Sequence, residues 1–173
     1  MGGPPQPGGR APSAVYISLM TSPTAPAIPP AIERVLRYFR SLGREEKMQA
    51  LVQYSRKLEP LPERLRAVDR SAFHVHECQT PVDIIPEVRD GTIHFWADVN
   101  ARQSPTVAAV LAIVLNAVND QPPAVTLAIP ENFVRTVMSD IGLGAREAGL
   151  MALVARLKRH AAEAERSMTP EPE

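Results

Sequence analysis

Prolines crowd the amino-terminal end of this chain of 173 residues. Eight of its 18 prolines lie in residues 1–30, together with four of nine glycines and a single charged side chain, Arg10. Proline lacks an N–H donor and fixes φ, so a series this dense excludes both a helix and an interior strand. We expect residues 1–30 to be a disordered lead-in, residues 167–173 a disordered tail, and residues 31–166 one folded domain.

The remaining composition excludes several classes of protein. One cysteine forms neither an internal disulfide nor a zinc site built on several cysteines. Nineteen basic and 19 acidic side chains balance, which leaves no electrostatic footprint for nucleic acid and no polybasic membrane patch. The longest apolar run, residues 107–118, is shorter than the roughly 20 residues that span a bilayer, and we see no signal peptide. We expect a cytoplasmic protein that binds neither nucleic acid nor membrane.

Helical periodicity flanks the middle of the chain on both sides. The predicted helices are residues 31–42, 44–58, 106–118, 131–140 and 145–166. The first two, broken at Gly43, should form an antiparallel pair. The second of them is expected to turn its apolar side chains inward: Met48, Leu51, Val52 and Leu58. Residues 106–118 are apolar almost all round, which predicts a buried central helix.

Alternation with a period of two predicts three strands between these helices, over residues 71–78, 82–89 and 92–99. Asp90-Gly91 is a strong signal for a two-residue hairpin turn, and it fixes the register of the last two strands. This register sets Asp83 opposite Asp98, which is destabilising unless a cation such as Arg102 lies between them. The predicted fold class is therefore α+β. It comprises a three-stranded antiparallel meander packed on a layer of the helix pair, the central helix and the long last helix.

The lone cysteine, Cys78, ends the first predicted strand and precedes a turn. A thiol at such a junction suits a nucleophilic or sulfur-carrying role, which requires access to a partner. The alternative is a small buried hydrophobic side chain without chemistry. A third interpretation is a metal site of His74, His76 and Cys78, spaced two residues apart on one strand face, with His94 as a further ligand. The predicted register, however, sets His94 opposite the second strand and not near the first.

Two segments of the sequence resemble the signatures of the SufE family, small sulfur-acceptor proteins that work with cysteine desulfurases in iron–sulfur cluster assembly. The first comprises Asp69-Arg70-Ser71 and Val75-His76-Glu77-Cys78-Gln79-Thr80-Pro81-Val82. The second is Ile141-Gly142-Leu143-Gly144-Ala145-Arg146-Glu147-Ala148-Gly149-Leu150. The order of the predicted helices and hairpin also resembles that of the family, over about residues 31–166.

This resemblance implies a function and a site. Cys78 would be the persulfide acceptor and Arg146 a stabiliser of charge on its sulfur, with His76 as a further candidate beside the thiol. The protein would take sulfur from a cysteine desulfurase, stimulate that enzyme and relay the sulfur to a cluster scaffold protein. It would hold no cofactor and no metal of its own, and act as a monomer or weak homodimer.

Three features depart from the family pattern, one of which is the segment before the central helix: residues 102–106 contain extra residues, and Ala108-Ala109 stands where the family has glycine. Glu77 stands where the family usually has glycine, and it adds a negative charge beside the thiol. Asp83 replaces a position that is usually apolar. These departures keep a second hypothesis open, a non-catalytic adaptor with the same fold that has lost sulfur transfer.

Overall fold

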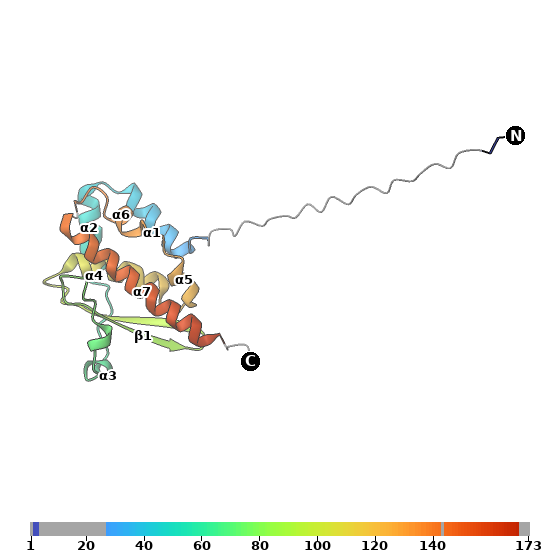
Figure 1. Ribbon diagram of the computed structural model, residues 1–173. Helices are drawn as coiled ribbons and strands as arrows, with labels where there is room; N and C mark the ends of the chain where they lie inside the picture. Colours follow the sequence, from blue (N-terminus) through green and yellow to red (C-terminus); the bar gives the residue numbers. More distant parts are fainter. Residues whose placement is uncertain (1, 4–26, 143, 170–173) are drawn as a thin grey trace.

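The computed structural model describes residues 2–3, 27–142 and 144–169; most of the predicted lead-in, residues 170–173 of the tail and Leu143 lie outside the described residues (Figure 1). The helices are α1 (Pro30–Ser41), α2 (Arg44–Ser55), α3 (Glu63–Arg66), α4 (Pro105–Val118), α5 (Pro123–Leu127), α6 (Phe133–Val137) and α7 (Glu147–Met168). Two 3-10 turns, η1 (Ser71–Phe73) and η2 (Gly144–Arg146), and two strands, β1 (Asp83–Arg89) and β2 (Thr92–Asp98), complete the fold. The predicted α+β class is confirmed.

Helix α4 is the centre of the core, as its apolar sequence predicts. Eleven of its 14 residues are buried, and the one polar residue within the run, Asn116, is exposed. Helices α1, α2 and α6 lie on one side of α4, and the long α7 crosses beside it (Figure 1). The predicted antiparallel pairing of α1 with α2 is wrong: α1 packs mainly against α6, and α2 packs against α4. Serine and proline at its start, Ser104-Pro105, mark the beginning of α4 where the sequence predicts it.

The hairpin register is confirmed in full. Strands β1 and β2 are antiparallel, and Asp83 pairs with Asp98, Ile85 with Trp96, and Glu87 with His94. Asp90 and Gly91 both have positive φ, 51° and 77°, as a type I′ turn requires. This turn matches the right-handed twist of the flanking strands, so the two-residue signal alone determines which residues face each other.

The predicted third strand is wrong, because the segment before β1 makes only one bridge to it. Residues Ser71–Phe73 form the turn η1, and then His74 bridges Asp83 while the N–H of Val75 donates to the carbonyl of Val82 at 2.9 Å. The N–H of Cys78 donates back to the carbonyl of Val75 at 3.2 Å, so the chain turns after a single pair. Within the described residues the sheet therefore has two strands.

Both faces of the hairpin are covered. One face contributes Ile84, Ile93 and Phe95 to the main core against α4 and α7. The opposite face contributes Ile85 to a smaller cluster with Leu61 and Leu65. Helix α3, which follows Pro62, supplies part of this second cover (Figure 1).

The predicted inward face of α2 is confirmed only in part: Leu51 is buried, and Leu58, which follows the end of α2, packs against the core. Met48 and Val52 are 46% and 43% exposed, whereas Lys47, Ala50 and Leu51 are buried. The buried face includes Lys47 because its ammonium reaches hydrogen-bond acceptors near the end of α6. A prediction that counts only apolar side chains cannot identify a lysine as part of the buried face.

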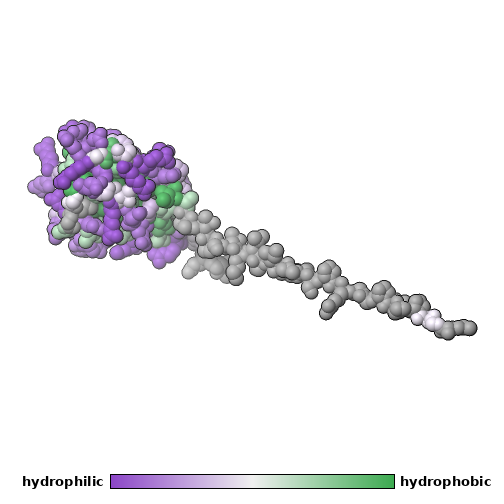
Figure 2. All heavy atoms as spheres, turned by 90° about the horizontal axis from the view of Figure 1, so that it is seen from above, coloured by the Kyte–Doolittle hydropathy of each residue, from purple (hydrophilic) through white to green (hydrophobic). Residues whose placement is uncertain are grey.

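The outer surface of the domain is mainly polar. Figure 2 shows hydrophilic side chains over most of the visible face, with smaller apolar areas between them. Among the described residues, no helix combines the length and apolar character that crossing a bilayer requires.

Candidate functional site

The cysteine loop, residues 76–81, is pinned at its base by two buried valines. Val75 and Val82 are 0% and 1% exposed, and the hydrogen bond from Val75 N–H to the Val82 carbonyl closes the loop between them. The six residues of the loop therefore project from a fixed point of the core. Cys78, at the middle of the loop, is a free, partly buried thiol.

Cys78 rests on the first turn of α7, where Gly149 leaves room for it. A Cβ atom at Gly149 would lie 3.4 Å from the Cys78 Sγ and 3.5 Å from its Cα. A glycine inside a helix costs roughly 1 kcal/mol relative to alanine. A Cβ here would make an ordinary van der Waals contact with the loop, so the space beside Cys78 admits a small side chain and not a large one. The sequence offered this glycine as part of a motif, but not as the neighbour of the thiol.

Cys78 lines a cavity of about 520 Å³ that is formed where two helices begin. Three segments make its wall: the cysteine loop, the start of α4 and the start of α7. The lining residues are Glu77, Cys78, Gln79, Thr80, Gln103, Ser104, Pro105, Thr106, Val107, Ala145, Arg146, Ala148, Gly149 and Leu150. Ser104 precedes the first residue of α4 and Arg146 the first residue of α7, so both helices direct their amino ends at the cavity.

Two opposing electrostatic influences meet at this cavity: the helix amino ends favour negative charge, and the carboxylate of Glu77 in its wall opposes it. The amino end of a helix carries a partial positive charge, because its first N–H groups have no partner within the helix. Neither Ser104 nor Arg146 caps these groups with its side chain. The Ser104 hydroxyl instead lies 3.3 Å from the Thr80 hydroxyl, a contact that ties the cysteine loop to α4. A small anionic group bound beside Cys78 would face two helix amino ends and the guanidinium of Arg146, and also the carboxylate of Glu77.

Of the three predicted site residues, two come together. Arg146, an exposed residue, lines the same cavity as Cys78. His76 is exposed and absent from the cavity wall; its ring lies against that of His74, with 4.9 Å between centroids. His74 in turn contacts the carboxylate of Asp83 through Nδ1 at 2.9 Å.

The histidines and the cysteine do not form a cluster. Because the chain turns after His74, the expected common strand face of His74, His76 and Cys78 is not formed, and His94 contacts Asp120 and Asn119 elsewhere. Among the described residues, no three histidine, cysteine, aspartate or glutamate side chains gather as a metal site would require.

The cation between the paired aspartates is Arg70 and not the expected Arg102. Its Nη1 contacts the carboxylates of both Asp83, at 3.3 Å, and Asp98. Arg70 immediately precedes η1, and this turn brings the side chain to the end of the hairpin. The pairing neutralises part of the repulsion that the hairpin register imposes.

Comparison with known proteins agrees with this architecture. The SufE family model, described as an Fe-S metabolism associated domain, matches residues 33–161. Two uncharacterised SufE-like proteins of Mycobacterium tuberculosis, from strains CDC 1551 and H37Rv, are each 30% identical over 151 residues, which cover 82% of this chain and 99% of theirs. The solution structure of a hypothetical protein from Thermus thermophilus superposes with a TM-score of 0.68 at 28% identity, covering 81% of this chain and 99% of the other.

The family match spans most of the folded domain, including both the cysteine loop and the start of α7. It therefore covers every segment that lines the Cys78 cavity. On this match the chain belongs to the SufE family, and its role lies in iron–sulfur metabolism.

Proposed function

We propose that this protein accepts sulfur on Cys78 from a cysteine desulfurase, stimulates that enzyme, and relays the sulfur to a cluster scaffold protein. The observation that carries the proposal is the position of Cys78 at a cavity where the amino ends of α4 and α7 meet. A thiol that lines a cavity beside an arginine and two helix amino ends has what sulfur transfer needs, which is access to a reactant and nearby positive charge.

The transfer is a thiol–disulfide type of exchange. The Cys78 thiolate attacks the terminal sulfur of the desulfurase persulfide and forms a new S–S bond. The original S–S bond breaks, and its electron pair leaves with the desulfurase cysteine as a thiolate. Sulfur moves without net oxidation or reduction, and the desulfurase is free for another turnover.

The surroundings of Cys78 suit the product of this step. A persulfide carries negative charge on its terminal sulfur, and the amino ends of the two helices favour such charge. The guanidinium of Arg146 supplies further positive charge and hydrogen-bond donors at the same cavity. The partly buried loop limits the access of other thiols, which protects the bound sulfur until a scaffold accepts it.

The compartment, the oligomeric state and the partners of the protein are part of this proposal. The protein acts in the cytoplasm, where a lone thiol stays reduced, as a monomer or weak homodimer with no metal or cofactor of its own. Residues 31–166 form the functional domain. Its partners are the desulfurase that supplies the sulfur and the scaffold that consumes it.

The test is intact-mass analysis after incubation with a cysteine desulfurase and free cysteine. We expect the protein to gain the mass of one sulfur atom on Cys78, and we expect Cys78→Ser to gain none and to lose stimulation of the desulfurase. Because the chain has one cysteine, the assignment is unambiguous. A wild-type protein that gains no sulfur, while Cys78→Ser stimulates equally well, would identify a non-catalytic adaptor instead.

The role of Arg146 is tested in the same assay with a matched pair. Arg146→Gln should slow the first transfer by roughly tenfold, the scale of one lost charge-assisted interaction. Arg102→Gln removes the same chemical group from an exposed position outside the cavity wall, and it should leave the rate unchanged. Equal rates for both variants would remove Arg146 from the mechanism.

A further inference from the structure

Helix α7 carries a buried arginine that faces the cysteine loop. Arg156 is 8% exposed, and its Nη2 lies 3.7 Å from the Oε2 of Glu77, the residue before Cys78. Its Nε is buried without a hydrogen-bond partner. Among the described residues, Glu77 is the one carboxylate that pairs with this guanidinium. Burying a guanidinium is costly unless it is paired, so this arginine calls for a specific explanation.

The segment that leads to the cysteine follows α7 over several turns. Phe73 packs near His160, Glu77 pairs with Arg156, and Cys78 rests on Gly149. The segment from Phe73 to Cys78 therefore runs antiparallel to α7, and each successive contact lies closer to the amino end of the helix. Glu77 is the charged contact in this series, and it sits directly beside the thiol in the sequence.

His160 does not compete for Glu77. It lies one turn after Arg156 on the same helix, and its Nδ1 is 3.4 Å from Glu163. Burial lowers the pKa of His160 below its ordinary value. The pKa of the Glu77 carboxyl is also lowered, first by a hydrogen bond from its own backbone N–H and then by Arg156 and Arg159. Arg156 is thus the buried cation that faces an ionised Glu77.

We propose that Arg156 is a positioning residue: through Glu77 it holds the cysteine loop against α7, so that Cys78 stays seated beside Gly149 and the helix amino end. This inference rests on the proposed function and deepens it. It also explains the departure at Glu77, where the family usually has glycine: the carboxylate anchors the loop to this helix. The pair is loose and half exposed on the Glu77 side, so a partner surface can replace it.

The first test measures the rate at which iodoacetamide alkylates the single thiol of the native protein. Arg156→Met and Glu77→Gln should each raise this rate about threefold or more, the effect of losing one partly buried ion pair. The double variant should be no faster than either single variant, because both changes break the same contact. Arg156→Lys, which keeps the charge, should stay close to wild type.

The direction of the two single effects separates positioning from simple electrostatics. A through-space charge effect alone would speed alkylation in Glu77→Gln and slow it in Arg156→Met, since the two substitutions remove opposite charges. Positioning predicts that both variants react faster. Arg159→Met is the matched control, because Arg159 is exposed on the same helix and acts on Glu77 at a distance without a direct contact.

Three results would overturn the inference: opposite effects of the two single variants, additive effects in the double variant, or an equal effect of Arg159→Met. Should Arg156→Met fail to fold, a salt titration answers the same question. Alkylation of the wild type should accelerate as salt screens the pair, whereas Glu77→Gln should not respond. Sulfur acceptance by the wild type is measured separately, so a failure of the proposed function is distinguishable from a failure of this one.

Discussion

At the scale of single residues, Gly149 is the position on which the site depends most directly. It lies in the first turn of α7, and a Cβ there would touch the Cys78 sulfur and Cα at the ordinary contact distances of 3.4 and 3.5 Å, so a side chain that extends beyond its Cβ would press on the loop. The thiol is seated where a small side chain fits and a larger one would displace the loop. Glycine weakens the start of the helix, because it loses more conformational freedom on folding than alanine does.

Two substitutions at Gly149 should therefore separate helix propensity from loop position. Gly149→Ala places a Cβ at 3.4 Å from the sulfur, an ordinary contact, and should raise the free energy of unfolding by up to about 1 kcal/mol. Gly149→Leu has no room for its branch and should push the loop away, so that Cys78 is alkylated several times faster. Denaturant unfolding and alkylation kinetics measure the two effects.

The exposed residue Ala155 on the same helix provides the control. Ala155→Leu adds the same atoms away from the loop and should leave alkylation unchanged. If Gly149→Leu reacts at the wild-type rate, the contact between Cys78 and α7 does not control access to the thiol.

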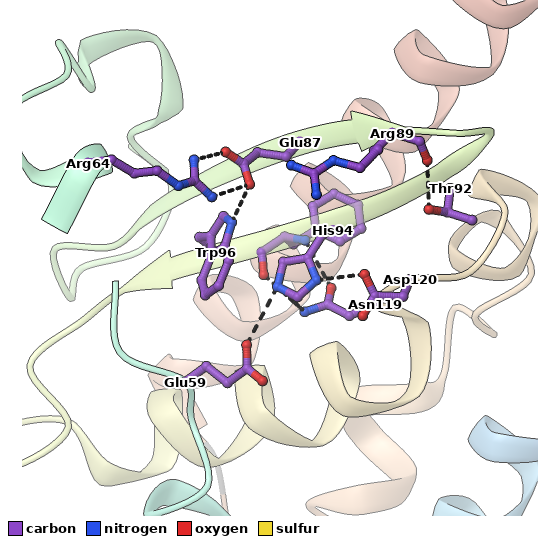
Figure 3. A network of polar contacts seen from close by, with 10 residues as sticks. Glu59, Arg64, Glu87, Arg89, Thr92, His94, Trp96, Asn119 and Asp120 are labelled. Atoms are coloured by element: carbon purple, nitrogen blue, oxygen red, sulfur yellow. Dashed lines mark hydrogen bonds and ion pairs between the residues drawn. The ribbon is translucent and has the colours of Figure 1, made fainter. Parts of the chain in front are cut away.

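At the scale of elements, the outer edge of β2 is closed by the segment that follows α4. The N–H of Ile93 donates to the carbonyl of Gln121 at 3.0 Å, and the amide of Asn119 bonds both the N–H and the carbonyl of Phe95. His94 adds a contact to Asp120 (Figure 3). A two-stranded sheet has two unprotected edges, and this segment covers one of them.

The hairpin is also tied to α3 by a cluster around Glu87 (Figure 3). Arg64 of α3 contacts both carboxylate oxygens of Glu87, one of them at 2.8 Å, and the indole N–H of Trp96 donates to the same carboxylate at 2.8 Å. The hydrogen bond from Arg64 is the main cause that lowers the pKa of Glu87 to about 2.

This shift predicts an acid-sensitive contribution to stability. Because the pKa of Glu87 is lower in the folded state, its contribution is present above pH 4.5 and is lost as the pH falls toward about 2. Solvent screening limits it to about 1 kcal/mol. Glu87→Gln should lose about that much stability at pH 7 and show a smaller loss between pH 4.5 and pH 2 than the wild type, measured by urea unfolding.

Glu63, which lies in α3 next to Arg64, is the control for this measurement. Its side chain is 89% exposed and pairs with Arg66 one turn away. Glu63→Gln should change the pH dependence little. Parallel curves for wild type and Glu87→Gln would show that the Arg64 and Trp96 contacts do not stabilise the ionised carboxylate.

At the scale of the whole molecule, Lys47 joins α2 to the segment that leads into the site. Lys47 as a whole is 1% exposed. Its ammonium donates to the carbonyl and the hydroxyl of Ser139, at 3.0 and 2.7 Å, and to the carboxylate of Asp140 at 3.3 Å. These acceptors precede η2 and the start of α7. The contact thus connects residues far apart in the sequence, 92 and 93 positions from one another.

Removing this connection should destabilise the fold as a whole. Lys47→Ala loses the buried aliphatic stem and three hydrogen bonds, and should cost about 2–4 kcal/mol of unfolding free energy. Lys47→Met keeps most of the packing and should cost less. Chemical denaturation measures both.

Lys57, an exposed lysine stacked over Tyr54, is the control at this scale. Lys57→Ala should cost about 1 kcal/mol or less. Equal losses for Lys47→Ala and Lys57→Ala would mean that the buried ammonium contributes nothing beyond an ordinary surface contact.

Much of this protein follows from the sequence by local rules. The Asp90-Gly91 turn determines its own conformation, and with it every pair of the hairpin. The apolar run of α4 predicts a buried helix because apolar side chains lie on nearly every face of it. The cysteine loop and the residues around Arg146 are contiguous motifs, so they are recognisable without the fold.

The tertiary structure decided what depends on distant segments meeting. Residues 71–78 alternate like a strand, yet they form one bridge, because a ladder needs a partner that continues beside them. The sequence offers 19 basic and 19 acidic side chains, and only the packing selects Arg70 for Asp83 and Asp98, Lys47 for Asp140, and Arg156 for Glu77. Periodicity records which face of a backbone is buried, whereas an ion pair depends on which segments that burial brings together.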